Sequence, residues 1–361
     1  MLMDPSALIP TPDILPVSWG WFQFLLIITL FFHIILMNVM LGTGIIAFVK
    51  NFRGDDDSDP LTRSISLKLP FTFAFTVNFG IAPLLFVQVL YGHFFYTSSV
   101  LMANFWLFVI GFLIFGYYMA YIYDYKYDAL KGSRVSVIGF SVLAMLTIAF
   151  LMSNNFTMMQ NPEVWTRYFE RPTGFLLNLA DPTFFPRYLH FVTAAIAVGG
   201  MSIALYFEFK RRRGDEEAVR WVRYGCDWFG YATIVNFAFG FWFFGSLPQH
   251  VRDTSTFVGI MIALLLLTGV ILGGLAIIYS LRGKIFPMVY TALSTVFIMI
   301  LIRDLVRVAY LKPYFSVSDL IVVPQYSPLV LFLVFFIGGL FLVYWMFKLA
   351  LKALDNKEVQ S

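Results

Sequence analysis

Apolar residues in this chain form long, nearly uninterrupted runs instead of alternating or following one face of a helix. About 20 consecutive apolar residues in a helix are enough to cross the hydrocarbon of a bilayer. Nine such runs occur, and they predict an all-α integral membrane protein, a nine-helix transmembrane bundle. The expected spans are 19–49, 70–97, 101–125, 135–152, 188–209, 224–245, 257–281, 286–310 and 328–351.

The composition agrees with this pattern. Of the 361 residues, 60% are apolar and only 13% are charged, whereas a soluble domain carries about 25% charged residues. No connection is long enough for a second domain, so residues 1–361 are expected to form a single transmembrane domain with no nucleic-acid partner. Cys226 is the only cysteine, which excludes internal disulfides, cysteine-ligated clusters and the attachment site of a c-type haem.

The basic residues predict the orientation of the bundle. Of the 25 lysines and arginines, 18 follow the odd-numbered spans, including the run Lys210–Arg213. Lysine and arginine mark the loops that stay in the cytoplasm. We therefore expect a multi-pass protein of a bacterial-type inner membrane, with the N-terminus outside and the C-terminus cytoplasmic. The acidic tract Asp55–Asp59 offsets the first basic loop only in part, because acidic residues contribute little to this rule.

The four histidines fall at different depths in this topology. His33 lies about 14 residues into the first span, or ~21 Å at 1.5 Å per residue, near mid-membrane. His190 begins the fifth span, whereas His93 and His250 lie towards the outer surface. Polar groups inside membrane spans are costly and often functional. The alternative is that each histidine only bonds to a neighbouring helix, and this reading is preferred for His93 and His250.

Other side chains that could bind a haem or its iron are expected near the outer membrane surface, at the same depth as His190. Met261 begins the seventh span, and a histidine and a methionine from two helices are a known axial pair for haem iron. Met201 and His250 are competing sixth ligands. Arg187 precedes His190 by one turn, where it could pair with a haem propionate.

The eighth span contains the charged sequence RDLVR, Arg303–Arg307. Asp304 is a candidate iron ligand or proton carrier, and Arg303 and Arg307 are candidates to neutralise propionates. The alternative is a cluster of ion pairs at the membrane interface.

Several of these segments resemble subunit I of the cytochrome bd quinol oxidases. The segment QFLLIITLFFHIILMNVMLG places His33 nine residues before Gly42, which is similar to the family's high-spin haem helix. RYLHFVTAAIAVGGM resembles the helix whose histidine ligates the low-spin haem b, with small residues Ala194, Ala195, Gly199 and Gly200 expected to make room for the macrocycle. MMQNPEVW, FVGIMIALL and RDLVR resemble three further family segments, the last with Asp304 in place of a ligating glutamate.

The chain also departs from that family. The long outer loop that helps to bind quinol is replaced by the short segment 245–256, and residues 98–118 carry none of the family's acids. Gln88 stands near the position of another family glutamate, and Ile300 replaces a tryptophan. Reduction of oxygen consumes protons, which need titratable or hydrated groups in the membrane. The resemblance therefore implies retained haem binding, and the departures predict weak oxygen reduction by this chain alone.

The leading expectation is a haem b-binding electron-transfer subunit of a respiratory membrane complex. The resemblance implies one haem b, with room for up to three, and partners that include a second bd-type subunit, quinol or an outer c-type cytochrome. His190 and Met261 would ligate one haem iron, and His33 would ligate a second haem. The alternatives are a bd-type terminal oxidase subunit that reduces oxygen, a haem-poor structural subunit that pairs with a true subunit I, and, least favoured, a transporter.

Overall fold

The computed structural model describes residues 5–54 and 60–358, so the acidic tract Asp55–Asp59 lies outside the described residues. Over these ranges the chain is helical, with one isolated β-bridge and no strand. The long helices are α1 (Trp19–Phe52), α2 (Pro60–Leu101), α3 (Ala103–Tyr125), α5 (Arg134–Gln160), α6 (Phe184–Arg212), α7 (Ala218–Ser246), α9 (Phe257–Leu281), α10 (Ile285–Leu311) and α11 (Tyr326–Glu358). Short helices are η1 (Pro5–Leu8), α4 (Tyr127–Leu130), η2 (Lys131–Ser133), η3 (Pro162–Glu170), α8 (Gln249–Arg252) and η4 (Val317–Asp319).

Each predicted span has a long helix at its position, but several helices extend beyond the apolar run. α2 begins ten residues before the predicted span and continues through Pro70 and Pro83; its only non-helical backbone is at Tyr91, with φ −132° and ψ 26°. α5 continues to Gln160 and ends where Asn161 precedes Pro162, because a residue before proline is disfavoured in helical conformation. Hydropathy therefore located the apolar part of these helices better than their ends.

Eight helical stretches in the described chain are long and apolar enough to cross a membrane, and α7 is not among them. The sequence of α7 mixes its apolar residues with Arg220, Arg223, Asp227 and Asn236 and with several glycines and aromatic residues. This mixture lowers its mean hydropathy. The described residues therefore form an all-α membrane protein with eight candidate membrane-spanning helices.

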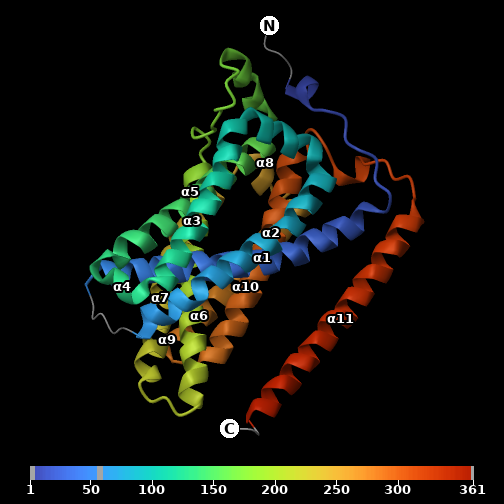
Figure 1. Cartoon of the computed structure of the whole chain (residues 1–361). Helices are drawn as coiled ribbons and strands as arrows, with labels where there is room; N and C mark the ends of the chain where they lie inside the picture. The colour runs from blue at the N-terminus through green and yellow to red at the C-terminus, as the bar shows by residue number, and fades with distance from the viewer. Residues whose placement is uncertain (1–4, 55–59, 359–361) are drawn as a thin grey trace.

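Neighbouring helices form antiparallel pairs that pack into one bundle (Figure 1). α1 packs against α2 and α6, α6 packs against α7, and α9 packs against α10 and α7. α11 stands apart from this bundle (Figure 1), and no residue from Tyr326 to Lys352 is buried. Its start is tied to the N-terminal segment, where the Leu15 amide donates to the Ile321 carbonyl at 2.9 Å.

The small residues after His190 serve helix packing. A Cβ atom on Gly42 of α1 would lie 1.9 Å from the carbonyl oxygen of Ala195, and one on Gly199 would lie 2.4 Å from the carbonyl carbon of Gly42. On the next face, a Cβ atom on Gly200 would lie 2.6 Å from the backbone nitrogen of Phe229 in α7. Small residues allow this close approach of helices in membranes. The expectation that Ala195, Gly199 and Gly200 make room for a cofactor is therefore wrong, because other helices already fill that space.

Candidate functional site

His33 is held against the second helix of its own hairpin. Its Nδ1 lies 3.1 Å from the backbone carbonyl oxygen of Thr76 in α2. One turn further along α2, Gly80 lies under the imidazole ring, where a Cβ atom would be 2.8 Å from the Cε1 of His33. The ring therefore occupies a space that exists only because residue 80 has no side chain.

His190 is held in the same way in the α6–α7 hairpin. Its Nδ1 lies 3.3 Å from the backbone carbonyl oxygen of Asn236, and a Cβ atom on Gly240 would lie 3.2 Å from both Cε1 and Nδ1 of the ring. Thr193, one turn after the histidine, donates from Oγ1 to Oδ1 of Asn236 at 2.6 Å. These two bonds fix the register of α6 against α7 at this level.

In both hairpins the acceptor carbonyl precedes the glycine by four residues. A carbonyl can only accept, so a neutral ring must carry its hydrogen on Nδ1 to make this bond, which leaves the lone pair on Nε2. Neutral imidazole nitrogen is the usual form of a histidine metal ligand, and its other ring nitrogen is commonly bonded to a backbone carbonyl or carboxylate. His33 and His190 are therefore arranged as histidine ligands of a metal commonly are.

Sequence reasoning missed these glycines and carbonyls, although a signal was present. Residues 76–80 read TVNFG and residues 236–240 read NFAFG, so a polar residue precedes a Phe-Gly pair by the same interval in both helices. The meaning of this interval depends on which histidine faces the glycine across the hairpin.

Arg187 is buried one turn before His190. Only 6% of the residue is exposed. Its Nη2 donates to Oε1 of Gln160 at 3.0 Å, its guanidinium lies 5.1 Å from the ring centre of Phe243, and its Nε has no partner among the described residues. A buried guanidinium that is incompletely bonded is a candidate to bind an anion, because leaving such a group unpaired is costly.

The charged sequence of the eighth span is also largely buried, in α10. Asp304 accepts a hydrogen bond from Nε2 of Gln23 in α1 at 2.6 Å and forms an ion pair with Arg307. Arg307 is 3% exposed and lies over the ring of Tyr91, 4.3 Å from its centre. Arg303 lies over the ring of Phe156 at 4.7 Å. The ion pair of Asp304 with Arg307 agrees with the ion-pair cluster that the sequence left open as the alternative, and the burial of Arg307 places this pair inside the protein.

Arg187, Arg303 and Arg307 form one electrostatic group. Arg303 interacts with both other guanidinium groups and with Asp304, and it also interacts with His33. Asp304 is the ion-pair partner of Arg307 alone among the described residues. Arg187 also interacts with the carboxylate of Asp181. Three guanidinium groups thus share two carboxylates, which leaves an excess of positive charge in a largely buried position, where an uncompensated charge is expensive.

Met261 lies on α9, four residues after the start of that helix and half-buried. The main packing partners of α9 are α10 and α7, so its place as a ligand opposite His190 stays a prediction. Of the two competing ligands, Met201 is 4% exposed within a hydrophobic cluster that includes Phe229 and Ala197. His250 is exposed on α8, with its ring 6.0 Å from that of Tyr310.

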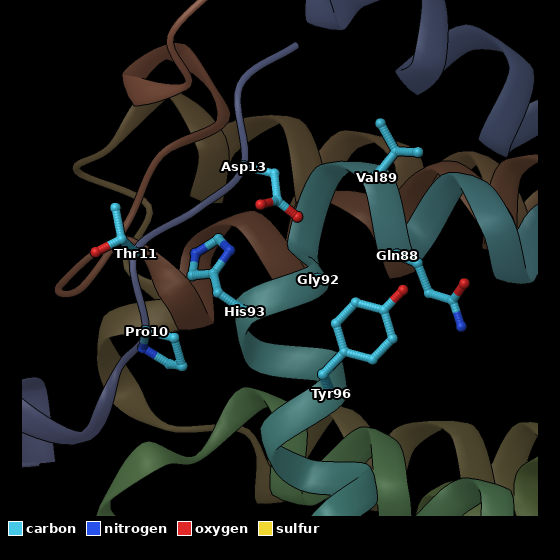
Figure 2. Close-up of a pocket in the computed structure, with 8 residues that line it drawn as sticks. All are labelled: Pro10, Thr11, Asp13, Gln88, Val89, Gly92, His93 and Tyr96. Carbon is cyan, nitrogen blue, oxygen red and sulfur yellow. The ribbon is translucent and has the colours of Figure 1, made fainter.

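His93 lies at a separate cavity of about 150 Å³ between α2 and the N-terminal segment (Figure 2). Its ring is 8% exposed, packs 4.5 Å from the ring of Phe315, and has no partner for Nε2 among the described residues. Figure 2 shows Asp13, Gln88 and Tyr96 around the same opening. The structure thus buries a histidine that the sequence suggested was interfacial.

No described part of the chain brings together three or more His, Cys, Asp or Glu side chains that could hold a metal ion. A haem iron needs only one or two side-chain ligands from the protein, so single histidines such as His33 and His190 suit that cofactor. No family model matches the chain, and no curated protein matches it.

Proposed function

We propose that this chain is a haem b-binding electron-transfer subunit of a respiratory membrane complex, resembling subunit I of the cytochrome bd quinol oxidases. When bound, haem supplies a carrier of single electrons. The observation that carries the proposal is the shared arrangement of His33 and His190, in which Nδ1 meets a backbone carbonyl and the ring rests on a glycine. Polar groups inside membrane spans are costly and are functional-site candidates, so two such arrangements inside apolar helices support the proposal.

The excess positive charge supports the same proposal. Arg187, Arg303 and Arg307 would bind the propionates of haem, because carboxylates are the natural partners of guanidinium groups. The Nε atoms of Arg187 and Arg307 have no partner within the described part of the chain, so they are donors available to such an anion. Asp304, already bonded to Gln23 and Arg307, would orient Arg307 in preference to ligating iron.

For His190 the proposed sixth ligand is Met261. A methionine raises the reduction potential of a haem relative to a second histidine. For His33 we propose a second haem, so that the chain would hold at least two. This second site favours one alternative function, a bd-type terminal oxidase subunit that reduces oxygen.

We propose nine membrane spans, with α7 as the ninth spanning helix. α7 packs closely on α6 at Gly200 and Gly225 and carries Asn236 and Gly240 to the level of His190. Because α7 contacts α6 along this length, α7 must lie at nearly the same depth in the membrane as α6. The positive-inside rule then places the N-terminus outside and the C-terminus in the cytoplasm of a bacterial-type inner membrane.

The electron donors and acceptors follow from the short connection between α7 and α9. We propose exchange of electrons with quinol or with an outer c-type cytochrome, and a second bd-type subunit as membrane partner. The connection leaves little outer loop for quinol, which favours the c-type cytochrome for part of this route.

The test is a reduced-minus-oxidised spectrum and a haem-to-protein ratio of the purified chain. The proposal expects a low-spin b-type signal that His190→Ala abolishes, and a ratio that His33→Ala lowers. His93→Ala is the matched control, because His93 lies at a separate cavity between α2 and the N-terminal segment, and it should change neither quantity. Absence of haem from a folded wild-type protein would support the structural-subunit alternative instead. High-spin or chlorin-type signals beside the low-spin signal would support the oxidase alternative.

A further inference from the structure

Four basic residues, Lys210–Arg213, lie at the end of α6. A buried carboxylate, that of Glu208, pairs with two of them and not with the other two. Glu208 is 4% exposed. It accepts from Nε of Arg211 at 2.8 Å and from Nε of Arg212 at 3.0 Å. One carboxylate therefore serves both arginines, and this face of the helix keeps one net positive charge.

Lys210 in the last turn of α6 and Arg213, the residue that caps its C-terminus, lie on a different face from Glu208. Together with Tyr206 and Phe209 they follow the spacing i, i+3, i+4, i+7, which places four side chains on one side of a helix. These four residues line a hollow of about 410 Å³. Neither Lys210 nor Arg213 forms an ion pair with a carboxylate of the described chain.

A third cation lies beside this hollow. Lys68 of α2 donates from Nζ to the hydroxyl of Tyr206 at 3.2 Å, and the same Nζ lies 4.2 Å from the centre of that ring. On the other side, Phe209 packs edge-on against Phe286 of α10 at 5.9 Å. Lys210 and Arg213 thus line the hollow and Lys68 lies beside it. The rings of Tyr206 and Phe209 line it towards the apolar part of α6.

We propose that this hollow binds the phosphate headgroup of an anionic phospholipid. Lys210 and Arg213 would bind the phosphate, since guanidinium and ammonium groups are the usual phosphate ligands in proteins. Tyr206 would donate its hydroxyl, and Phe209 would contact the start of the acyl chains, as aromatic residues do at the membrane interface. Basic pockets at the ends of membrane helices bind such headgroups, and 410 Å³ falls within the ~300–1,000 Å³ of small-molecule sites.

The experiment compares lipid binding by the purified full-length chain and two double variants with the same change in charge. Native mass spectrometry would count phosphatidylglycerol and phosphatidylcholine retained by each protein. One variant is Lys210→Gln with Arg213→Gln, and the control is Arg282→Gln with Lys284→Gln, in the connection between α9 and α10. Each basic residue near a membrane surface contributes ~1 kcal/mol to anionic lipid binding, or about fivefold in affinity. We therefore expect about 25-fold weaker phosphatidylglycerol binding in the first variant, with little change in the control.

Three results would overturn the proposal. Equal loss in both variants would mean that only overall charge matters. Equal retention of phosphatidylcholine by the wild-type protein would mean that the anionic headgroup is not recognised. Displacement of phosphatidylglycerol by equimolar inorganic phosphate would mean that free phosphate is the ligand. Should the first double variant fail to fold, Arg213→Gln alone, at an exposed position, should still weaken binding about fivefold, and an unchanged affinity would count against the site.

Discussion

Gly80 of α2 lies directly under the imidazole of His33, so that a methyl group on it would come within 2.8 Å of the ring. The corresponding distance from Gly240 of α7 to the ring of His190 is 3.2 Å. The two histidines thus depend to different degrees on the absence of a side chain on the opposite helix.

Gly80→Ala should displace His33, and Gly240→Ala should displace His190 less, because its contact is longer. Alanine favours a helix over glycine by about 1 kcal/mol, so a lost haem signal in either variant could not come from a weaker helix. Haem content and the b-type spectrum would be measured for each variant. Gly274→Ala is the matched control, since a Cβ atom on this glycine of α9 meets nothing within 4 Å. If Gly80→Ala and Gly274→Ala behave alike, the contact with His33 has no role.

Met261→Ala should convert the low-spin signal towards high spin and lower its reduction potential, because the thioether would be lost as sixth ligand. Spectra and a redox titration would measure both effects. Met201→Ala removes a methionine from a packed cluster and should leave the spectrum unchanged. An unaltered spectrum and potential in the Met261 variant would make the methionine assignment wrong, and His250 would become the first candidate.

Asp304→Asn should destabilise the protein strongly, because it removes the ion-pair partner of the buried Arg307. Breaking one side of a buried pair typically costs about 3–5 kcal/mol, and removal of both charges costs less. The unfolding midpoint in detergent should therefore recover in part when Arg307→Met is added. Asp124→Asn is the control. Its pair with Arg63 is partly exposed at 3.8 Å, and such pairs contribute about 0–1 kcal/mol. A double variant less stable than Asp304→Asn alone would contradict this account.

Gly42→Leu should prevent α1 from packing against α6. Even the first carbon of the new side chain would overlap the Ala195 carbonyl, and overpacking of a tight contact commonly costs 1–3 kcal/mol or more. We expect loss of monodisperse protein on size-exclusion chromatography. Gly111→Leu, in open space on α3, should be tolerated; equal behaviour of the two variants would show that the crossing is less close than described.

Oxygen uptake by the purified chain alone should be weak or absent, whether the donor is quinol or an artificial reductant. Residues 98–118 carry no acid to deliver the protons that water formation needs. An oxygen electrode would measure the rate. Quinol-driven uptake at ordinary oxidase rates without a partner subunit would refute this prediction.

Much of the architecture followed from the sequence, because apolar runs and the cost of polar groups in lipid are local properties. They indicated the long helices and singled out His33, His190, Arg187 and Arg307 as candidate functional residues. The ends of the helices were predicted less accurately from the sequence, because a helix such as α2 continues beyond the apolar run that marks its membrane-spanning part.

Contacts between residues of different helices could not be predicted, because they depend on how one helix is positioned along the next. The small residues Ala195, Gly199 and Gly200 suggested space for a cofactor, but their neighbours in α1 and α7 fill it. The pattern that contains Gly80 and Gly240, a polar residue four positions before the glycine of a Phe-Gly pair, was not recognised in the sequence. A glycine acquires its role only from the side chain that faces it, and nothing in one helix alone reveals that partner.

The isolation of α11 from the bundle has a consequence for how the chain can be altered. A lone helix in lipid needs only apolar length and its own backbone hydrogen bonds. In the described chain α11 is joined to the remainder by the pairing of Leu15 with Ile321 and Val323 and buries no residue from Tyr326 to Lys352. Its individual side chains are therefore interchangeable with other apolar ones as far as the bundle is concerned. An unrelated transmembrane helix of equal length could be grafted after Gln325 without disturbing either histidine. The last helix needs only an apolar composition, whereas α1, α6 and α7 need particular residues at particular positions to pack together.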